Sequence, residues 1–364
     1  MLILWELVII FERRVVIKTG SLLLPFFAFF VIHLFSAVFP STRMIWSLKY
    51  TFRFFGLGLI FFIAINFITD KRRLNCLINS LFIGAGLAAL LVLLQYHFPY
   101  FFIEAQHFFD DAIVNPCRIR GFFGWPTNMS VYLGSFVPLI ISSLIYKPNK
   151  GRFLKKIFYV SLLFIIMLAL IFSQARGWIV GLFFGLSTLW LIYLIQRKNY
   201  KVICVTAAAL IITIIICWAL GISHLIIGDL EPSETGRLMF AKEALGLIKE
   251  HPFKGIGADM FFWESIYRCR THNIFLETAV NLGIFGLLIL LWLFYTIFKL
   301  IGKGLTESTG GSNRYIQVGI FASLVSFLAH NQVDYFWNQH EIIGLFWILV
   351  GIGVCVQVLG GLRN

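Results

Sequence analysis

Long apolar stretches alternate with short polar connections along most of the chain. A helix that spans a bilayer needs roughly 20 mostly apolar residues. Ten stretches meet this requirement, at 20–39, 51–69, 74–95, 128–146, 157–173, 177–196, 201–221, 274–298, 315–334 and 342–360. The pattern therefore predicts an all-α polytopic membrane protein with about 10–12 transmembrane helices. Residues 1–11 are also apolar, but they are too short to span unless the natural chain begins further upstream, and they lack the flanks of a signal peptide.

The composition agrees with this pattern, because 59% of the 364 residues are hydrophobic and only 13% are charged. Soluble domains average about 45–50% apolar and about 25% charged residues. A water-soluble protein of this size could not bury so much apolar surface. A soluble enzyme, a disordered tail and a disulfide scaffold are therefore excluded, and the charged residues that remain become the informative ones.

The basic residues indicate an orientation in the membrane. Cytoplasmic connections carry an excess of Lys and Arg. One orientation places 18 of the 30 basic residues in the cytoplasm, with every span alternating. It puts the C-terminus in the cytoplasm and the long polar loop 222–273 on the outer side. The net charge of +13 raises the question of a nucleic-acid partner. Membrane topology and anionic lipid headgroups already account for the cytoplasmic clusters of basic residues, so no nucleic-acid partner is expected.

The long outer loop contains one predicted amphipathic helix, over residues 236–250. Its apolar residues recur at helical spacing, at Leu238, Ala241, Leu245 and Ile248. Ser233 and Thr235 are candidate N-caps, which places Arg237 in the first turn. Free N–H groups at a helix N-terminus beside a guanidinium suit a phosphate or pyrophosphate, although a solvated surface Arg is the simpler interpretation.

Three further outer-face residues are candidates for function. Arg176 lies in a short break between two spans, where the positive-inside rule disfavours a cation. Arg118 lies in a Gly- and Pro-rich turn before a span, and anchoring in an aromatic belt explains it equally well. His272 stands between Arg270 and Asn273, a candidate N-cap for the next span. Imidazole is the natural general base near neutral pH.

This set of residues suits transfer from a lipid-linked pyrophosphate. The arginines would neutralise the leaving pyrophosphate in place of a metal ion, and His272 would take the proton of an acceptor hydroxyl. No D-x-D pair or His/Asp cluster in the sequence clearly holds a divalent ion. Glu277, on the first turn of the span after His272, is the alternative or supporting partner. No role is assigned to His330, Asp334 and His340.

Five short motifs, in order along the chain, resemble the O-antigen ligase and polymerase superfamily. They are Arg118-x-x-Gly121 with Pro126-x-Asn128, Ser173-x-x-Arg176-Gly177, Gly236-Arg237 before the amphipathic helix, Pro252-x-x-Gly255-x-Gly257, and His272-Asn273-x-x-Leu276-Glu277 with Gly283-x-x-Gly286. The resemblance runs from about residue 118 to 290. Two positions depart from it, because Ala175 stands where Ser is frequent and Asn281 where an acidic residue is common.

The resemblance implies a GT-C-type membrane glycosyltransferase that is metal-independent, needs no cofactor and inverts the anomeric carbon. In such a protein Arg176, Arg237 and, less directly, Arg118 would bind the pyrophosphate of a polyprenyl-linked glycan donor. His272 would act on the acceptor. The candidate supporting residues are Arg270, Asn273 and Glu277. The implied location is the bacterial inner membrane, with the active site on the periplasmic face.

The expected organisation has three parts: an N-terminal transmembrane region to 117, a catalytic region at 118–298 that includes the outer loop, and C-terminal transmembrane helices at 299–364. The acceptor could be a lipid-linked glycan, a lipid A-core or a protein hydroxyl, and the motifs do not separate ligase from polymerase. A transporter or flippase of lipid-linked glycans is the alternative. It predicts ionisable residues at mid-membrane, broken helices and internal repeats, but the middles of the spans carry almost no charge and the sequence shows no convincing repeat. A scaffold protein would leave the ordered motifs unexplained. Cys117 and Cys269 both fall on the outer side and could pair.

Overall fold

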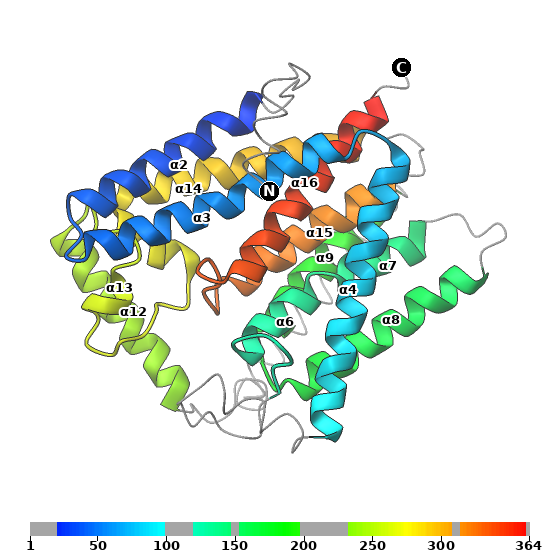
Figure 1. The fold of residues 1–364 in the computed structure, drawn as a ribbon, viewed down its shortest axis with the longest axis horizontal. Coiled ribbons are helices and arrows are strands. Elements are labelled where there is room, and N and C mark those ends of the chain that lie inside the picture. Colours follow the sequence, from blue (N-terminus) through cyan, green and yellow to red (C-terminus); the bar gives the residue numbers. More distant parts are fainter. Residues whose placement is uncertain (1–19, 99–118, 147–152, 197–231, 308–313, 362–364) are drawn as a thin grey trace.

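The computed structural model describes residues 20–98, 119–146, 153–196, 232–307 and 314–361, and this part of the chain contains helices and no strand (Figure 1). The helices are α2 (Gly20–Val38), α3 (Met44–Phe67), α4 (Lys71–His97), α6 (Pro126–Gly134), α7 (Val137–Tyr146), α8 (Phe153–Phe172), α9 (Gly177–Gln196), α12 (Pro232–Glu250), α13 (Phe261–Glu264), α14 (Ile274–Glu307), α15 (Arg314–His330) and α16 (His340–Gly361).

The predicted all-α membrane fold is confirmed. Within the described ranges, eight helical segments are long and apolar enough to cross a bilayer. One of them, Pro126–Ile145, comprises α6 and α7 together. The predicted span at 315–334 corresponds to α15, which has 17 residues. The predicted span at 201–221 lies outside the described residues.

The bundle is held by closely packed helix pairs. In Figure 1, α15 lies between α16 and α9, and it packs against both as well as against α7. Lipid is as apolar as the helix surfaces, so close packing of small residues replaces the hydrophobic drive between helices. Gly181 of α9 shows this, because a Cβ there would lie 2.9 Å from the carbonyl oxygen of Ser326 in α15. Aromatic rings around the buried Trp347, from Phe26, Phe61 and Phe346, fill the space between α2, α3 and α16.

The described parts of the connections that the sequence assigns to the outer side lie together at one end of the bundle, which we call the site end. Figure 1 shows α12 and α13 at this end, beside the turn between α2 and α3. Three long-range hydrogen bonds join its segments: Ser36 Oγ to Asn281 O at 2.9 Å, Trp46 Nε1 to Asp259 Oδ2 at 3.1 Å, and Tyr50 Oη to Tyr335 Oη at 3.0 Å. Segments far apart in the sequence therefore build one surface.

Helix α14 is interrupted at Gly283, a break that the continuous apolar pattern at 274–298 does not predict. Gly283 has φ 71° and ψ −174°, outside the helical region. The loop 252–257 fills the break with its backbone. Ile256 N donates to Val280 O at 3.1 Å, and Ile284 N donates to Pro252 O at 2.8 Å. The loop thus satisfies backbone groups that the interrupted helix leaves open.

Replacing Gly283 by alanine should destabilise the protein by roughly 2–4 kcal/mol, because the residue has a positive φ and no room for a side chain. A Cβ there would lie 2.9 Å from Lys254 N and closer still to the backbone of Phe253. Thermal unfolding of the detergent-purified variant should show a clearly lower midpoint. Gly246→Ala is the control, because Gly246 is helical with no neighbour within 4 Å, and an equal loss in both variants would contradict the explanation.

Candidate active site

Arg237 and His272 meet at one carboxylate, that of Asp334. Arg237 Nη2 donates to Asp334 Oδ1 at 3.3 Å, and His272 Nδ1 lies 3.2 Å from the same oxygen. The side chain of Asp334 is 6% exposed, whereas those of Arg237 and His272 are 42% and 34% exposed. A buried anion therefore anchors a cation and an imidazole that both remain open to a ligand.

The hydrogen bond to Asp334 determines what His272 can do. When Nδ1–H donates to the carboxylate, Nε2 carries the lone pair and can accept a proton. Among the described residues, Nε2 of His272 has no hydrogen-bond partner. Phe240 of α12 stacks on the imidazole, with the ring centroids 6.1 Å apart. The ring is thus oriented on one edge and one face, and its free nitrogen is available.

Asn273 starts α14 as the sequence predicts. Its Oδ1 accepts hydrogen bonds from Phe275 N and Leu276 N, both at 3.0 Å, which is the pattern of an N-cap. Its Nδ2 donates to Gln332 Oε1 at 3.0 Å. Asn273 therefore ties the residue after His272 to the turn that carries Asp334.

Helix α12 differs from its prediction at the start. It begins at Pro232, where a proline is favourable because its missing N–H needs no partner. The predicted N-caps Ser233 and Thr235 are wrong, since both lie inside the helix. Arg237 is consequently in the second turn, beyond the first four free N–H groups. The contact with Asp334, rather than the helix N-terminus, gives Arg237 its place in the site.

The break that carries Arg176 also reaches this carboxylate. Gln174 has φ 53°, which ends α8 and turns the chain into α9. Gly177 packs so closely that a Cβ would lie 2.9 Å from Asp334 Oδ2. His330 Nε2 lies 3.8 Å from the same oxygen. The exposed Arg176 therefore directly precedes a glycine that leaves no room for a side chain beside His330 and Asp334.

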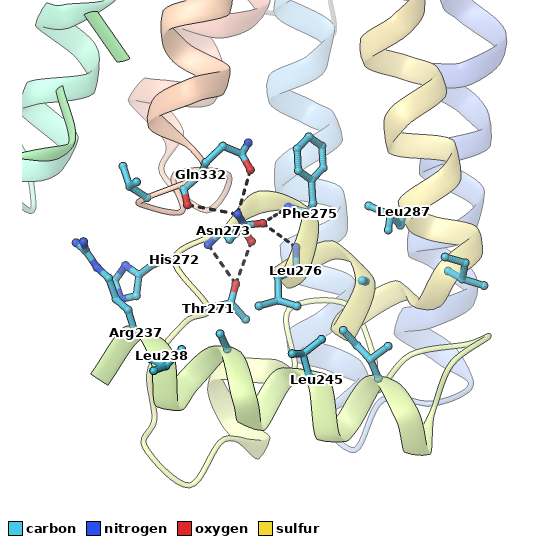
Figure 2. A pocket seen from close by; sticks show the side chains of 15 residues that line it. Arg237, Leu238, Leu245, Thr271, His272, Asn273, Phe275, Leu276, Leu287 and Gln332 are labelled. Atoms are coloured by element: carbon cyan, nitrogen blue, oxygen red, sulfur yellow. Dashed lines mark hydrogen bonds between the residues drawn. The ribbon is translucent and has the colours of Figure 1, made fainter. Parts of the chain in front are cut away.

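A cavity of about 760 Å³ opens between α12 and α14, with the site at one end. Figure 2 shows Arg237 and His272 side by side at this end, with Leu287 toward the other. Apolar side chains line most of the cavity, including Leu245 from α12 and Leu276 from α14. The arrangement suits an amphiphile with an anionic headgroup, because charge and apolar surface are separated along its length.

The geometry also explains the amphipathic pattern of α12. Ala244, which is fully buried, packs with Ile256, Phe261 and Val280 in a small core beneath the helix. Leu238 and Leu245 instead face the cavity and stay at least half exposed. The apolar face thus serves both as an anchor and as a cavity wall.

Comparison with known families agrees with the resemblance that the sequence motifs indicate. The O-antigen ligase family model matches residues 161–291. This part of the chain is O-antigen ligase-like. No curated protein matches the chain significantly.

The O-antigen ligase match contains the motifs of Arg176, Arg237 and His272 but begins after the predicted motif of Arg118. Arg118 itself lies outside the described residues, as does Cys117, so its pairing with Cys269 stays a prediction. The neighbouring turn is described: Gly121, with φ 61°, donates its N–H to Gln95 Oε1 of α4 at 2.7 Å. This turn is therefore fixed against α4.

Glu277 and Arg270 form a second, buried cluster beside the Arg237–Asp334–His272 group. Arg270 Nη1 contacts Asp259 Oδ1 at 2.6 Å and Glu277 Oε1 at 3.1 Å. Burial disfavours the charge on Arg270, but the carboxylates of Asp259 and Glu277 outweigh it and raise the pKa of the guanidinium. Both oxygens of Glu277 accept hydrogen bonds and its side chain is 1% exposed, which favours a supporting role over that of an alternative base.

The hydrogen bonds of Asn281 explain why this chain has an amide where an acidic residue is common in the proteins it resembles. Asn281 Oδ1 accepts from Phe261 N at 2.8 Å, and its Nδ2 donates to Glu277 Oε1 at 3.3 Å. A carboxylate at this position could not donate to Glu277. The amide therefore matches the buried acid next to it.

Asp334 was not predicted as a site residue. It received no role, like His330 and His340, because its partners lie 62 and 97 residues away in the sequence. The available signal was an acidic residue at the outer end of a span, in a chain with only 17 acidic residues.

Proposed function

We propose that this membrane protein is an outer-face glycosyltransferase that moves a glycan from a polyprenyl-pyrophosphate carrier to a hydroxyl acceptor. The observation that carries the proposal is the Arg237–Asp334–His272 group at the charged end of an apolar cavity. The O-antigen ligase family match at residues 161–291 supports a reaction of the O-antigen ligase and polymerase class.

The chemistry follows from the roles of three groups. The acceptor hydroxyl oxygen forms a bond to the anomeric carbon on the face opposite the pyrophosphate, and the bond from that carbon to the pyrophosphate oxygen breaks, so configuration inverts. His272 Nε2 takes the hydroxyl proton, and Asp334 stabilises the imidazolium that forms. The electron pair leaves with the pyrophosphate, whose growing charge the arginines neutralise.

Binding of the donor is assigned to the arginines and to the apolar wall of the cavity. Arg237 uses one nitrogen for Asp334 and keeps further N–H groups for a phosphate. Arg176 and Arg118 are the other proposed phosphate ligands. The apolar cavity wall beside Arg237 supports a substrate that carries a hydrocarbon chain. The acceptor, proposed to be a lipid-linked glycan, a lipid A-core or a protein hydroxyl, would approach His272.

The proposed location is the bacterial inner membrane, with the site end facing the periplasm and the C-terminus in the cytoplasm. The distribution of basic residues supports this orientation. A long translocated loop that carries α12 and α13 agrees with it, because long loops cross largely regardless of charge.

Reconstitution in liposomes tests the proposal against the flippase alternative. With a polyprenyl-pyrophosphate glycan as donor, we expect glycan transfer with release of polyprenyl pyrophosphate, and the rate should be unchanged by EDTA because arginines take the place of a metal. Movement of the donor across the bilayer with its glycan still attached, and no transfer, would support the flippase instead. Loss of turnover with EDTA that returns with a divalent ion would contradict the metal-free mechanism.

A further inference from the structure

His272 sits in an unusual backbone conformation. Its φ is 56°, in the left-handed region that is uncommon for residues other than glycine, although Asn, Asp and His adopt it more often than other residues do. Such a conformation persists only where the surroundings hold it. The segments on both sides of His272 must therefore be anchored, and the structure contains an anchor on each side.

The anchor after His272 is the N-cap of α14. Asn273 accepts from two backbone N–H groups and donates to Gln332, as described above. In addition, Ile274 N donates to Asn331 O at 3.0 Å. The chain leaving His272 is thus fixed to the turn that holds Asp334.

The anchor before His272 is Glu277. Its Oε2 accepts from Thr271 N at 2.9 Å, and its Oε1 accepts from Arg270 Nη1 at 3.1 Å. Glu277 thereby binds the two residues that precede His272. Asp259 holds the same guanidinium from the other side at 2.6 Å, and its own φ of 62° is also left-handed.

Burying the charged groups of this cluster costs more free energy than a purely structural contact would need. The cluster places two carboxylates and one guanidinium where their side chains are 3%, 1% and 16% exposed. Buried ion pairs of this kind often stabilise less than apolar residues of similar volume would. The need to fix the backbone beside His272 explains why charged groups occupy these buried positions.

We propose that Glu277 is a positioning residue for the transfer reaction, which acts by fixing the backbone on which His272 presents its imidazole. The inference rests on the proposed role of His272 as base. Two acceptor oxygens are required, because one receives the Thr271 amide and the other receives Arg270. Glutamine can offer only one oxygen and would turn an N–H₂ group toward a donor.

The test is a double-mutant cycle on the full-length reconstituted protein. Glu277→Gln should lower kcat about 10- to 100-fold, as expected for a displaced catalytic group, with KM for the lipid-linked donor nearly unchanged. In the His272→Ala background, the same substitution should cause no further loss of the residual rate. Groups that act as a unit are non-additive, whereas a general structural defect adds to the loss.

Controls separate positioning from folding. Thr278→Val removes the neighbouring hydrogen bond from Thr278 Oγ1 to Ile274 O and leaves Thr271 untouched, so kcat should stay within about twofold of wild type. Arg270→Lys, a second variant that keeps the charge, should lower kcat less than Glu277→Gln and show the same non-additivity. Thermal unfolding in detergent reports the fold of each variant.

The outcomes are distinct. Full kcat in Glu277→Gln, or losses that add to those of His272→Ala, would overturn the positioning role while leaving the proposed function intact. Full activity of His272→Ala alone would instead refute the proposed function on which the inference rests. Non-additive losses with an unchanged donor KM support the inference.

Discussion

His272→Ala should reduce glycan transfer by about 10²–10⁴-fold, because it removes the only proposed acceptor of the hydroxyl proton. Its imidazole contacts Asp334 through Nδ1 and leaves Nε2 for the acceptor, and an alanine cannot replace either function. A deletion strain complemented with the variant should lack the surface glycan on a gel. In liposomes the loss should fall on kcat, since the donor would still meet Arg237 and Arg176.

His251→Ala is the matched control for this experiment. His251 lies in the same outer loop at the end of α12, and its backbone, rather than its side chain, makes the hydrogen bond to Leu247. We expect this variant to restore surface glycan to the level of wild type. Normal activity of His272→Ala would remove the base from the mechanism, and equal losses in both variants would indicate damage to the loop as a whole.

The fold was largely predictable, because each transmembrane helix leaves a local apolar signal. The spans at 20–39 and 177–196 correspond closely to α2 and α9. The break in α14 was not predictable in this way, since Gly283 stands within a continuous apolar run. The backbone of the loop 252–257 replaces helical hydrogen bonds at the break. This loop is distant in sequence from Gly283, and the periodicity of apolar residues detects only local structure.

The site was predictable only in part, for a similar reason. Arg237 was named for its place at the start of a predicted amphipathic helix, and His272 as a natural general base beside Arg270. The structure brings both to one carboxylate. For the carboxylate the local signal was only an acidic residue at the outer end of a span, because its role depends on a turn between α15 and α16 that folds back on the outer loop. The start of α12 was misplaced because Ser233 and Thr235 are good N-caps, while Pro232 is a better first residue.

Asp334→Asn should lower kcat by about 10²–10⁴-fold while leaving the fold intact, because the amide has nearly the shape of the carboxylate but not its charge. An amide cannot stabilise the imidazolium that forms when His272 takes a proton. It can also turn its N–H₂ toward Nδ1, which would favour the tautomer that protonates Nε2 and blocks the base. The steady-state rate of transfer, with thermal unfolding as a check, measures this effect.

Glu341→Gln provides the comparison, because it makes the same change in charge at the start of α16, close in sequence to Asp334. Glu341 contacts Asn128 Nδ2 at 3.5 Å and, within the described part of the chain, forms no hydrogen bond or ion pair with Arg237 or His272. Its activity should stay within about twofold of wild type. If Asp334→Asn were as active as Glu341→Gln, the carboxylate would serve only to hold Arg237, and the orientation of His272 would have to come from Phe240 and the anchors on either side of it.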